Sequence, residues 1–124
     1  MELFAIRPEI RFGPEALAAL EELAGRRVLI VTDEFLAHKS GLLEGVKARL
    51  KGCEIRVFDQ VRPDPSLRLV AQGVHVLRAF GPDAVLAFGG GSPMDCAKAM
   101  RHFAGGDPPP ELWCIPTTAG TGSE

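Results

Sequence analysis

The feature that most constrains the fold of this chain is an apolar run, residues 84–88, that leads directly into the three glycines Gly89–Gly91. Apolar residues at helical spacing follow, so the stretch predicts a strand, a sharp turn and a helix. Glycine has no Cβ, which lets the backbone reverse direction and lets a ligand come close to the peptide groups. Because the first N–H groups of a helix have no partner within the helix, such a corner suits a phosphate.

The same stretch also permits a purely structural interpretation. Ser92 can be the N-cap of the helix and Pro93 its first residue, with Asp95 reaching back to the cap as in a capping box. The run fits neither common nucleotide-binding pattern, because Met94 stands at the sixth position of G-x-G-x-x-G and no Gly-Lys-Ser/Thr is present. This stretch alone therefore leaves phosphate binding and helix capping open as alternatives.

Length and composition exclude several classes of protein. The 124 residues predict one domain, and 46% hydrophobic with 24% charged residues is typical of a soluble protein. A net charge of -2 gives no basic surface for nucleic acid or for a membrane, and the apolar runs are too short to span a bilayer. The segment Met1–Arg7 lacks the pattern of a secretory signal, so a cytoplasmic protein is expected.

The thiol and imidazole side chains do not form metal-binding patterns. The cysteines are three, widely spaced and within apolar runs: Cys53, Cys96 and Cys114. Buried, reduced thiols are the expectation for such residues. The histidines are equally scattered: His38, His75 and His102. No metal site is therefore expected within this chain, and His75 is expected at the surface.

Strand and helix patterns alternate along the chain. Four stretches have the pattern of parallel strands: 27–33, 54–58, 84–88 and 112–116. Helical patterns surround them: 14–25, 36–50 in which Gly41 and Gly45 predict a break, 67–80 with Ser66 as its cap, and a last helix with Cys96, Ala99, Met100 and Phe103 on its buried side. Leu67, Val70, Val74 and Leu77 mark the buried face of the third of these helices. The order predicts an α/β fold with a doubly wound, mainly parallel sheet, preceded by edge strands or a hairpin within residues 1–13.

Polar residues follow each predicted strand. Asp33, Asp64, the turn at 89–92 and the hydroxyl-rich run at 117–121 would all emerge at the carboxyl edge of the sheet. Ligands bind at that edge in open α/β sheets, so the convergence predicts a ligand site. For Asp33 taken alone, capping of the next helix remains the alternative.

Four motifs in the same order resemble the iron-containing (group III) alcohol dehydrogenases. They are Val-Thr-Asp at 31–33, Pro-Asp-Pro-Ser at 63–66, Gly-Gly-Gly-Ser-Pro-Met-Asp at 89–95 with Ala97-Lys98, and Ile-Pro-Thr-Thr-Ala-Gly-Thr-Gly-Ser-Glu at 115–124. The resemblance covers nearly the whole chain. It implies a Rossmann-like N-terminal domain of the dehydroquinate-synthase type that binds NAD(P). It also implies a following helical domain that holds a divalent metal, Fe or Zn, through an Asp and three His.

The resemblance assigns cofactor-binding roles to matching residues. Gly90, Gly91 and Ser92 would line the pyrophosphate, Asp95, Thr117, Thr118 and Thr121 would lie near the nicotinamide half, and Asp33 would lie beside the adenosine ribose. A carboxylate there can accept a hydrogen bond from the 2′-OH and would repel a 2′-phosphate, so NAD is expected over NADP.

Two departures from the family pattern concern connections. The family's frequent Pro-Asn-Pro-Thr is replaced by 63–66, so Asp64 would meet a ligand without an amide donor. The connection from Met100 to Leu112 is shorter than in many members, which is similar to the propanol dehydrogenases of bacterial microcompartments. A location inside such a compartment is then an option within the cytoplasm.

The metal ligands implied by the family would lie beyond Glu124. Residues 1–124 are therefore interpreted as the dinucleotide-binding part of an NAD-dependent alcohol dehydrogenase that interconverts a small alcohol with its aldehyde or ketone. This part would contain no catalytic and no metal-binding residue, and would be inactive alone. It would form homo-oligomers through its N-terminal strands or an exposed sheet edge. The alternatives are a free-standing nucleotide-binding module, or a relative of glycerol dehydrogenase or dehydroquinate synthase.

Overall fold

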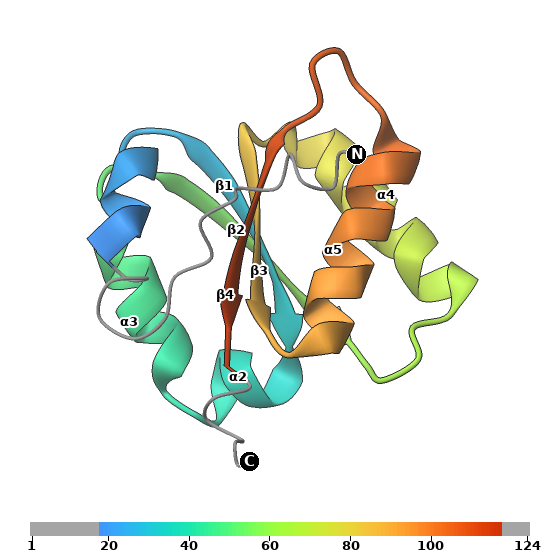
Figure 1. Ribbon diagram of the computed structural model, residues 1–124, viewed down its shortest axis with the longest axis horizontal. Helices are drawn as coiled ribbons and strands as arrows, with labels where there is room; N and C mark the ends of the chain where they lie inside the picture. Colours follow the sequence, from blue (N-terminus) through green and yellow to red (C-terminus); the bar gives the residue numbers. More distant parts are fainter. Residues whose placement is uncertain (1–17, 118–124) are drawn as a thin grey trace.

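A sheet of four parallel strands forms the centre of the molecule, in a computed structural model that describes residues 18–117. The strands are β1 (Arg27–Asp33), β2 (Glu54–Val61), β3 (Ala84–Gly89) and β4 (Glu111–Pro116). Their order in the sheet is β2-β1-β3-β4, so the chain first moves outward from β1 to β2 and then crosses back to β3 (Figure 1). The predicted α/β fold with a doubly wound parallel sheet is confirmed. Residues 1–13, and with them the predicted hairpin, lie outside the described part.

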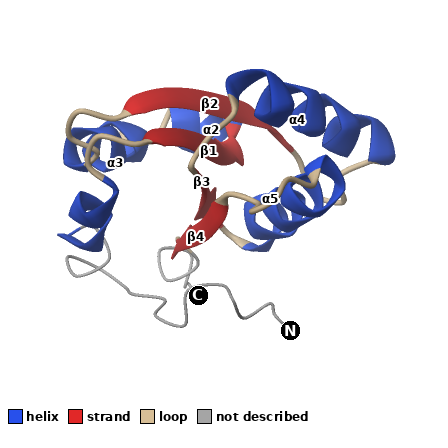
Figure 2. Ribbon diagram, turned by 90° about the horizontal axis from the view of Figure 1, so that it is seen from above, coloured by secondary structure: helices blue, strands red, loops and turns tan. Residues whose placement is uncertain are grey.

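Helices cover both faces of this sheet. They are η2 (Leu20–Leu23), a short 3-10 helix, and α2 (Glu34–His38), α3 (Leu42–Arg49), α4 (Leu67–Phe80) and α5 (Gly91–Ala104). Figure 2 shows α4 and α5 on one side of the strands and α3 on the other. In the first predicted helix, Leu20 and Leu23 are fully buried, as expected for its apolar face. Gly25, which follows its end as predicted, has a φ of +78°.

Alternate residues of the central strands divide the core into two layers. Val28 and Ile30 of β1 pack toward η2, α2 and α3, whereas Leu29 and Val31 pack toward α4 and α5. Every residue of β3 is buried. Strands covered on both faces need apolar side chains at consecutive positions, which explains the uninterrupted apolar runs in the sequence.

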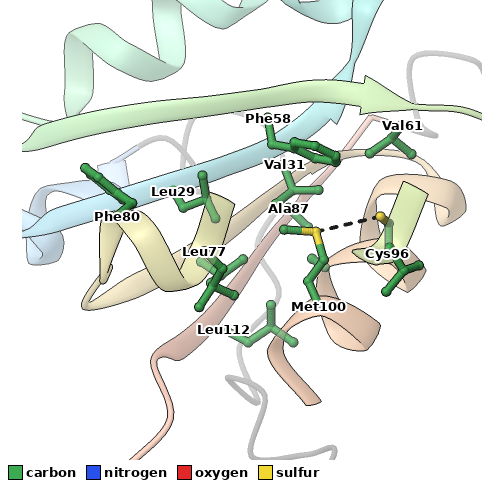
Figure 3. Packing of buried hydrophobic residues seen from close by; sticks show 13 residues of the cluster. Leu29, Val31, Phe58, Val61, Leu77, Phe80, Ala87, Cys96, Met100 and Leu112 are labelled. Atoms are coloured by element: carbon green, nitrogen blue, oxygen red, sulfur yellow. Dashed lines mark hydrogen bonds between the residues drawn. The ribbon is translucent and has the colours of Figure 1, made fainter. Parts of the chain in front are cut away.

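Two sulfur-containing side chains pack in the core layer between the sheet and helices α4 and α5. Met100 lies beneath the sheet among Leu77, Ala87 and Leu112, and its Sδ accepts a contact of 3.8 Å from the Sγ of Cys96 (Figure 3). Burial raises the pKa of Cys96 to about 11, so this thiol stays protonated. All three cysteines are free, with Cys96 buried and the other two half-buried, as expected for reduced thiols.

The predicted break in the second helix is confirmed, and two apolar residues lie at the surface against expectation. The break follows α2 at Gly41, which has a φ of +79°, whereas Gly45 lies on the exposed side of α3, where a helical backbone tolerates it. Leu67 is 82% exposed because it is the first residue of α4, ahead of the turns that reach the sheet. Phe103 is 58% exposed and borders a hollow lined mainly by residues of α4, whereas the buried residues of α5 are Pro93, Cys96, Ala97 and Met100.

Candidate functional site

The carboxyl ends of the strands meet at one edge of the sheet, near α2 in Figure 1. In register, Val31 pairs with Ala87 and Gly89 pairs with Pro116. The structure therefore brings the residues that follow β1, β3 and β4 to one place: Asp33, Gly90, Gly91, Ser92 and Thr117. Thr118 and Thr121 lie outside the described residues.

The turn after β3 requires glycine at its first position. Gly89 has a φ of +140°, and a Cβ built on it would lie 2.8 Å from Pro93 Cγ and 3.0 Å from Leu36 Cδ1. Any larger residue would therefore be strained and would collide with the first turn of α5. The glycine allows the strand to pass directly into the helix.

The capping-box interpretation of this turn is wrong. The N-cap of α5 is Gly90, in an extended conformation, so that Ser92 and Pro93 already lie inside the first turn. No side chain makes a capping hydrogen bond to α5 within the described residues. The glycines complete the reversal two residues earlier than a serine cap would allow, because their backbone needs no room for side chains.

The start of α5 has the properties of an anion site. The first N–H groups of a helix have no acceptor within it, and Pro93 contributes no N–H, which leaves those of Gly91 and Ser92. Gly91 is exposed, and a Cβ built on it would meet no atom within 4 Å. A phosphate can therefore approach the backbone at this position, where the helix dipole favours negative charge.

The carbonyl groups just before the turn are already engaged. Phe88 O accepts a hydrogen bond of 2.7 Å from Thr32 Oγ1, and Gly89 O accepts one of 3.1 Å from the N–H of Thr117. These bonds tie β3 to its neighbours on both sides. Thr32 was part of a sequence motif, but its contact was not predicted; a lone polar residue at the end of a buried strand is the signal that could have revealed it.

Asp33 caps α2, as the helix-capping alternative for this residue predicted. Its Oδ1 accepts a hydrogen bond of 2.8 Å from the N–H of Leu36. The side chain is half-buried at the end of β1. A carboxylate has two acceptor oxygens, so capping leaves the second one available for a ribose hydroxyl.

The far end of α2 is attached to the outer strand. His38 Nε2 lies 2.6 Å from Asp59 Oδ2. Burial raises the pKa of Asp59, but hydrogen bonds from His38 and Gln60, together with the charge of His38, lower it below its ordinary value overall. Both ends of α2 are therefore held, one by Asp33 and one by Asp59.

Asp64 lies apart from these groups, although at the same edge. It follows β2, which is two strands away from β3, a spacing of about 10 Å between strand axes. Asp64 is exposed and has a φ of +54°, a conformation that Asp and Asn tolerate better than most residues. It borders a hollow of about 410 Å³ with Arg62 and Arg68, and nearby Ser66 caps α4 as predicted.

The remaining predicted residues lie at the surface of α5 and α4. Asp95 is exposed in the second turn of α5, and His75 is exposed on α4 as expected. Across residues 18–117, no three His, Cys, Asp or Glu side chains gather in a way that could hold a metal ion. No helix in this range combines the length and apolar character needed to cross a bilayer.

Comparison with known proteins gives a consistent result. The family model described as iron-containing alcohol dehydrogenase matches residues 8–124. The chain is 39% identical to 1-propanol dehydrogenase PduQ of Salmonella typhimurium over 127 residues, which cover all of this chain and 34% of that protein. It is 36% identical to an NADPH-dependent butanol dehydrogenase of Clostridium saccharobutylicum over 105 residues, with 83% and 27% covered.

Solved structures agree with the sequence comparison. An iron-containing alcohol dehydrogenase from Thermococcus thioreducens superposes with a TM-score of 0.77 at 27% identity, covering 96% of this chain and 38% of that one. The chain thus spans about a third of the length of the relatives it matches. Since the family model covers nearly all of its residues, the chain belongs to the iron-containing alcohol dehydrogenase family.

Proposed function

We propose that this chain binds NAD at the carboxyl edge of its sheet and is the cofactor-binding part of a metal-dependent alcohol dehydrogenase. The observation that carries the proposal is the glycine turn into α5, whose first helical turn has no side-chain cap and which opens at the same carboxyl edge of the sheet as Asp33. Gly90, Gly91 and Ser92 would hold the pyrophosphate through backbone N–H groups. Asp33 would accept a hydrogen bond from the adenosine ribose.

The other predicted residues have subordinate roles in this proposal. Thr117, Thr118, Thr121 and Asp95 would border the nicotinamide half, and Asp64 would lie at the edge of the adenosine side. Asp33 supports a preference for NAD, because its charge would repel the 2′-phosphate of NADP. The NADPH dependence named for the butanol dehydrogenase relative makes this preference worth measuring directly.

The bound nicotinamide would supply hydride chemistry, accepting a hydride from an alcohol carbon. The described residues bind and orient the cofactor, while the Fe or Zn expected for the family would be held by residues outside this chain. On this proposal the chain alone does not turn over an alcohol. The PduQ relative supports a small alcohol and its aldehyde as substrates of the complete enzyme, working in the cytoplasm or in a microcompartment there.

Calorimetric titration with NAD and NADP tests the proposal. Saturable heat with NAD and weaker binding of NADP are expected. An absence of saturable heat with either cofactor at millimolar concentration would overturn the proposed function, including the alternative of a free-standing nucleotide-binding module.

A matched pair of glycine variants tests whether the cofactor binds at the start of α5. Gly91→Ala adds a methyl group where the protein leaves open space, and Gly45→Ala does the same within α3, away from the site. Both variants are expected to fold, since Ala favours helix over Gly. Gly91→Ala should weaken NAD binding by about tenfold, equivalent to about 1.4 kcal/mol, because the methyl group occupies the phosphate's place. Gly45→Ala should bind like the parent chain; equal losses in the two would contradict the proposed site.

We also propose that copies of the chain associate through the strands predicted within residues 1–13 or through an outer strand of the sheet. Sedimentation across a range of concentrations measures this, and a monomer throughout would refute it.

A further inference from the structure

Thr32 is the one polar side chain that is fully buried among residues 18–117. It lies one residue before Asp33, and its Oγ1 donates a 2.7 Å hydrogen bond to the carbonyl of Phe88. Phe88 in turn lies one residue before Gly89, where the glycine turn begins. A single side-chain bond therefore joins the last part of β1 to the last part of β3, directly beneath the proposed cofactor site.

The position of this bond is where β1 leaves its regular pairing. The register between β1 and β3 runs from Val28 and Ala84 to Val31 and Ala87, and stops there. The register between β1 and β2 shifts between Val31 and Asp33. The Thr32 hydroxyl thus extends the β1–β3 connection one residue beyond the last paired residues. Past this point the two strands diverge, one into α2 and the other into α5.

Contacts around Gly89 connect this bond to both parts of the site. A Cβ on Gly89 would lie within 3.0 Å of Leu36 in α2 and closer still to Pro93 in α5, so the two helices meet at this glycine. The N–H of Leu36 is the group that Asp33 caps. A displacement of β3 at Phe88 would therefore change the spacing between Asp33 and the first turn of α5.

We propose that Thr32 is a positioning residue of the cofactor site, whose hydroxyl sets the spacing between Asp33 at the end of β1 and the glycine turn that opens α5. This inference rests on the proposed function, in which Asp33 contacts the ribose and the turn contacts the pyrophosphate. Without the hydroxyl, the buried carbonyl of Phe88 lacks this donor and the two strand ends are free to separate. A ligand that spans both subsites is then bound less well, whereas a ligand that contacts Asp33 alone is little affected.

Three variants of the whole chain test this role. Thr32→Val keeps the size and removes the hydroxyl, and Thr32→Ser keeps the hydroxyl. Ile30→Val is the control, since Ile30 is buried in the same strand on the same face and has no polar contact to lose. Dissociation constants are measured for NAD and ADP-ribose, which span both subsites, and for adenosine, which reaches the ribose subsite only.

The expected pattern is specific to the hydroxyl. Thr32→Val should weaken NAD and ADP-ribose by about tenfold, the effect of losing one buried hydrogen bond, and should change adenosine binding by less than about twofold. Thr32→Ser should restore binding to within about twofold of the parent chain. Unchanged NAD binding in Thr32→Val, no rescue by Ser, or an equal loss in Ile30→Val would each overturn the inference.

A second measurement separates this inference from the proposed function. If the parent chain binds no cofactor, the proposed function fails. The role of Thr32 in positioning the turn is then tested by NMR, from the amide resonances of Gly89–Ser92. Thr32→Val should shift these resonances and Thr32→Ser should return them toward the parent positions. Resonances that stay in place in Thr32→Val would show that the hydroxyl does not position the turn.

Discussion

At the scale of single residues, Asp33 combines a structural task with the proposed recognition of the ribose. One oxygen caps α2 through Leu36, and this bond fixes the direction of the carboxylate at the end of β1. A side chain fixed in this way loses little rotamer freedom when a ligand binds. The two tasks can be separated experimentally, because Asn is as good a cap as Asp but carries no charge.

Asp33→Asn is therefore expected to keep the stability of the chain while reducing its preference for NAD over NADP. Asp33→Ala should lose the preference and also about 1 kcal/mol of unfolding free energy, the usual cost of losing an N-cap. Urea unfolding gives the stability, and parallel titrations with the two cofactors give the preference. If Asp33→Asn left the ratio of the two affinities unchanged, Asp33 would not be the discriminating residue.

Asp59 gives the chain a predictable response to acid. Its pKa in the folded chain lies below its ordinary value of 3.8, since the contacts with His38 and Gln60 outweigh the effect of burial. The folded state then binds this proton less readily than the unfolded state, so the stabilisation is complete above pH 3.8 and is lost as pH falls through the lowered folded pKa.

Asp59→Asn should accordingly narrow the difference in stability between pH 7 and pH 3, measured by urea unfolding at the two pH values. Asp107→Asn, which changes an exposed carboxylate in the connection between α5 and β4, is the control and should leave that difference as it is. An identical acid response in Asp59→Asn and the parent chain would contradict the role of Asp59.

At the scale of elements, the glycine turn is the most constrained part of the fold. Gly89 has a positive φ and is crowded by Pro93 and Leu36, whereas Gly41, which begins α3, has a positive φ and open space around it. Comparing Gly89 with Gly41 distinguishes the cost of backbone strain from the cost of a steric collision. Both effects act at Gly89, and strain alone acts at Gly41.

Gly41→Ala should therefore cost about 1 kcal/mol of unfolding free energy, and Gly89→Ala about 2 to 4 kcal/mol. Chemical unfolding of the two variants under the same conditions gives the comparison. Equal costs would mean that Pro93 and Leu36 move away from the added methyl group without penalty.

The sequence predicted most of the elements because buried parallel strands leave long apolar runs and because Ser66 is an ordinary helix cap. It did not distinguish Ser92 from Gly90 as the start of α5, since both choices satisfy local preferences and the decision depends on Leu36 and Pro93 packing around Gly89. It also placed Phe103 in the core, because helical periodicity does not show where a helix extends past the sheet it covers.

The sequence predicts which residues lie at the candidate site better than it predicts how they are arranged. The edge that gathers Asp33, the glycine turn and Thr117 follows from strand order alone. The bond between Thr32 and Phe88 does not, because it depends on where the pairing of β1 with β3 stops. Sequence patterns describe a strand's faces well and its ends poorly.

At the scale of the whole molecule, the proposed function makes the chain a cofactor-binding unit whose substrate chemistry depends on residues elsewhere. The proposed cofactor site lies where the strands end and the helices begin. On this proposal the chain alone, given NAD, 1-propanol and added Fe²⁺ or Zn²⁺, should produce no NADH above background. Absorbance at the NADH band measures this, with a complete family member as the positive control; turnover by the chain alone would contradict the proposal.

The missing side-chain cap at the start of α5 has one more consequence. If a phosphate accepts hydrogen bonds from Gly91 and Ser92, the ligand takes the place of the missing side-chain cap, and these N–H groups have acceptors only in the bound state. Cofactor binding then stabilises the first turn of α5, and the formed turn in return increases the affinity for the cofactor. By linkage, the two effects have the same free energy. The first turn of α5 would be the part of the chain whose amide hydrogens exchange more slowly when NAD is added, and the melting temperature would rise with cofactor concentration.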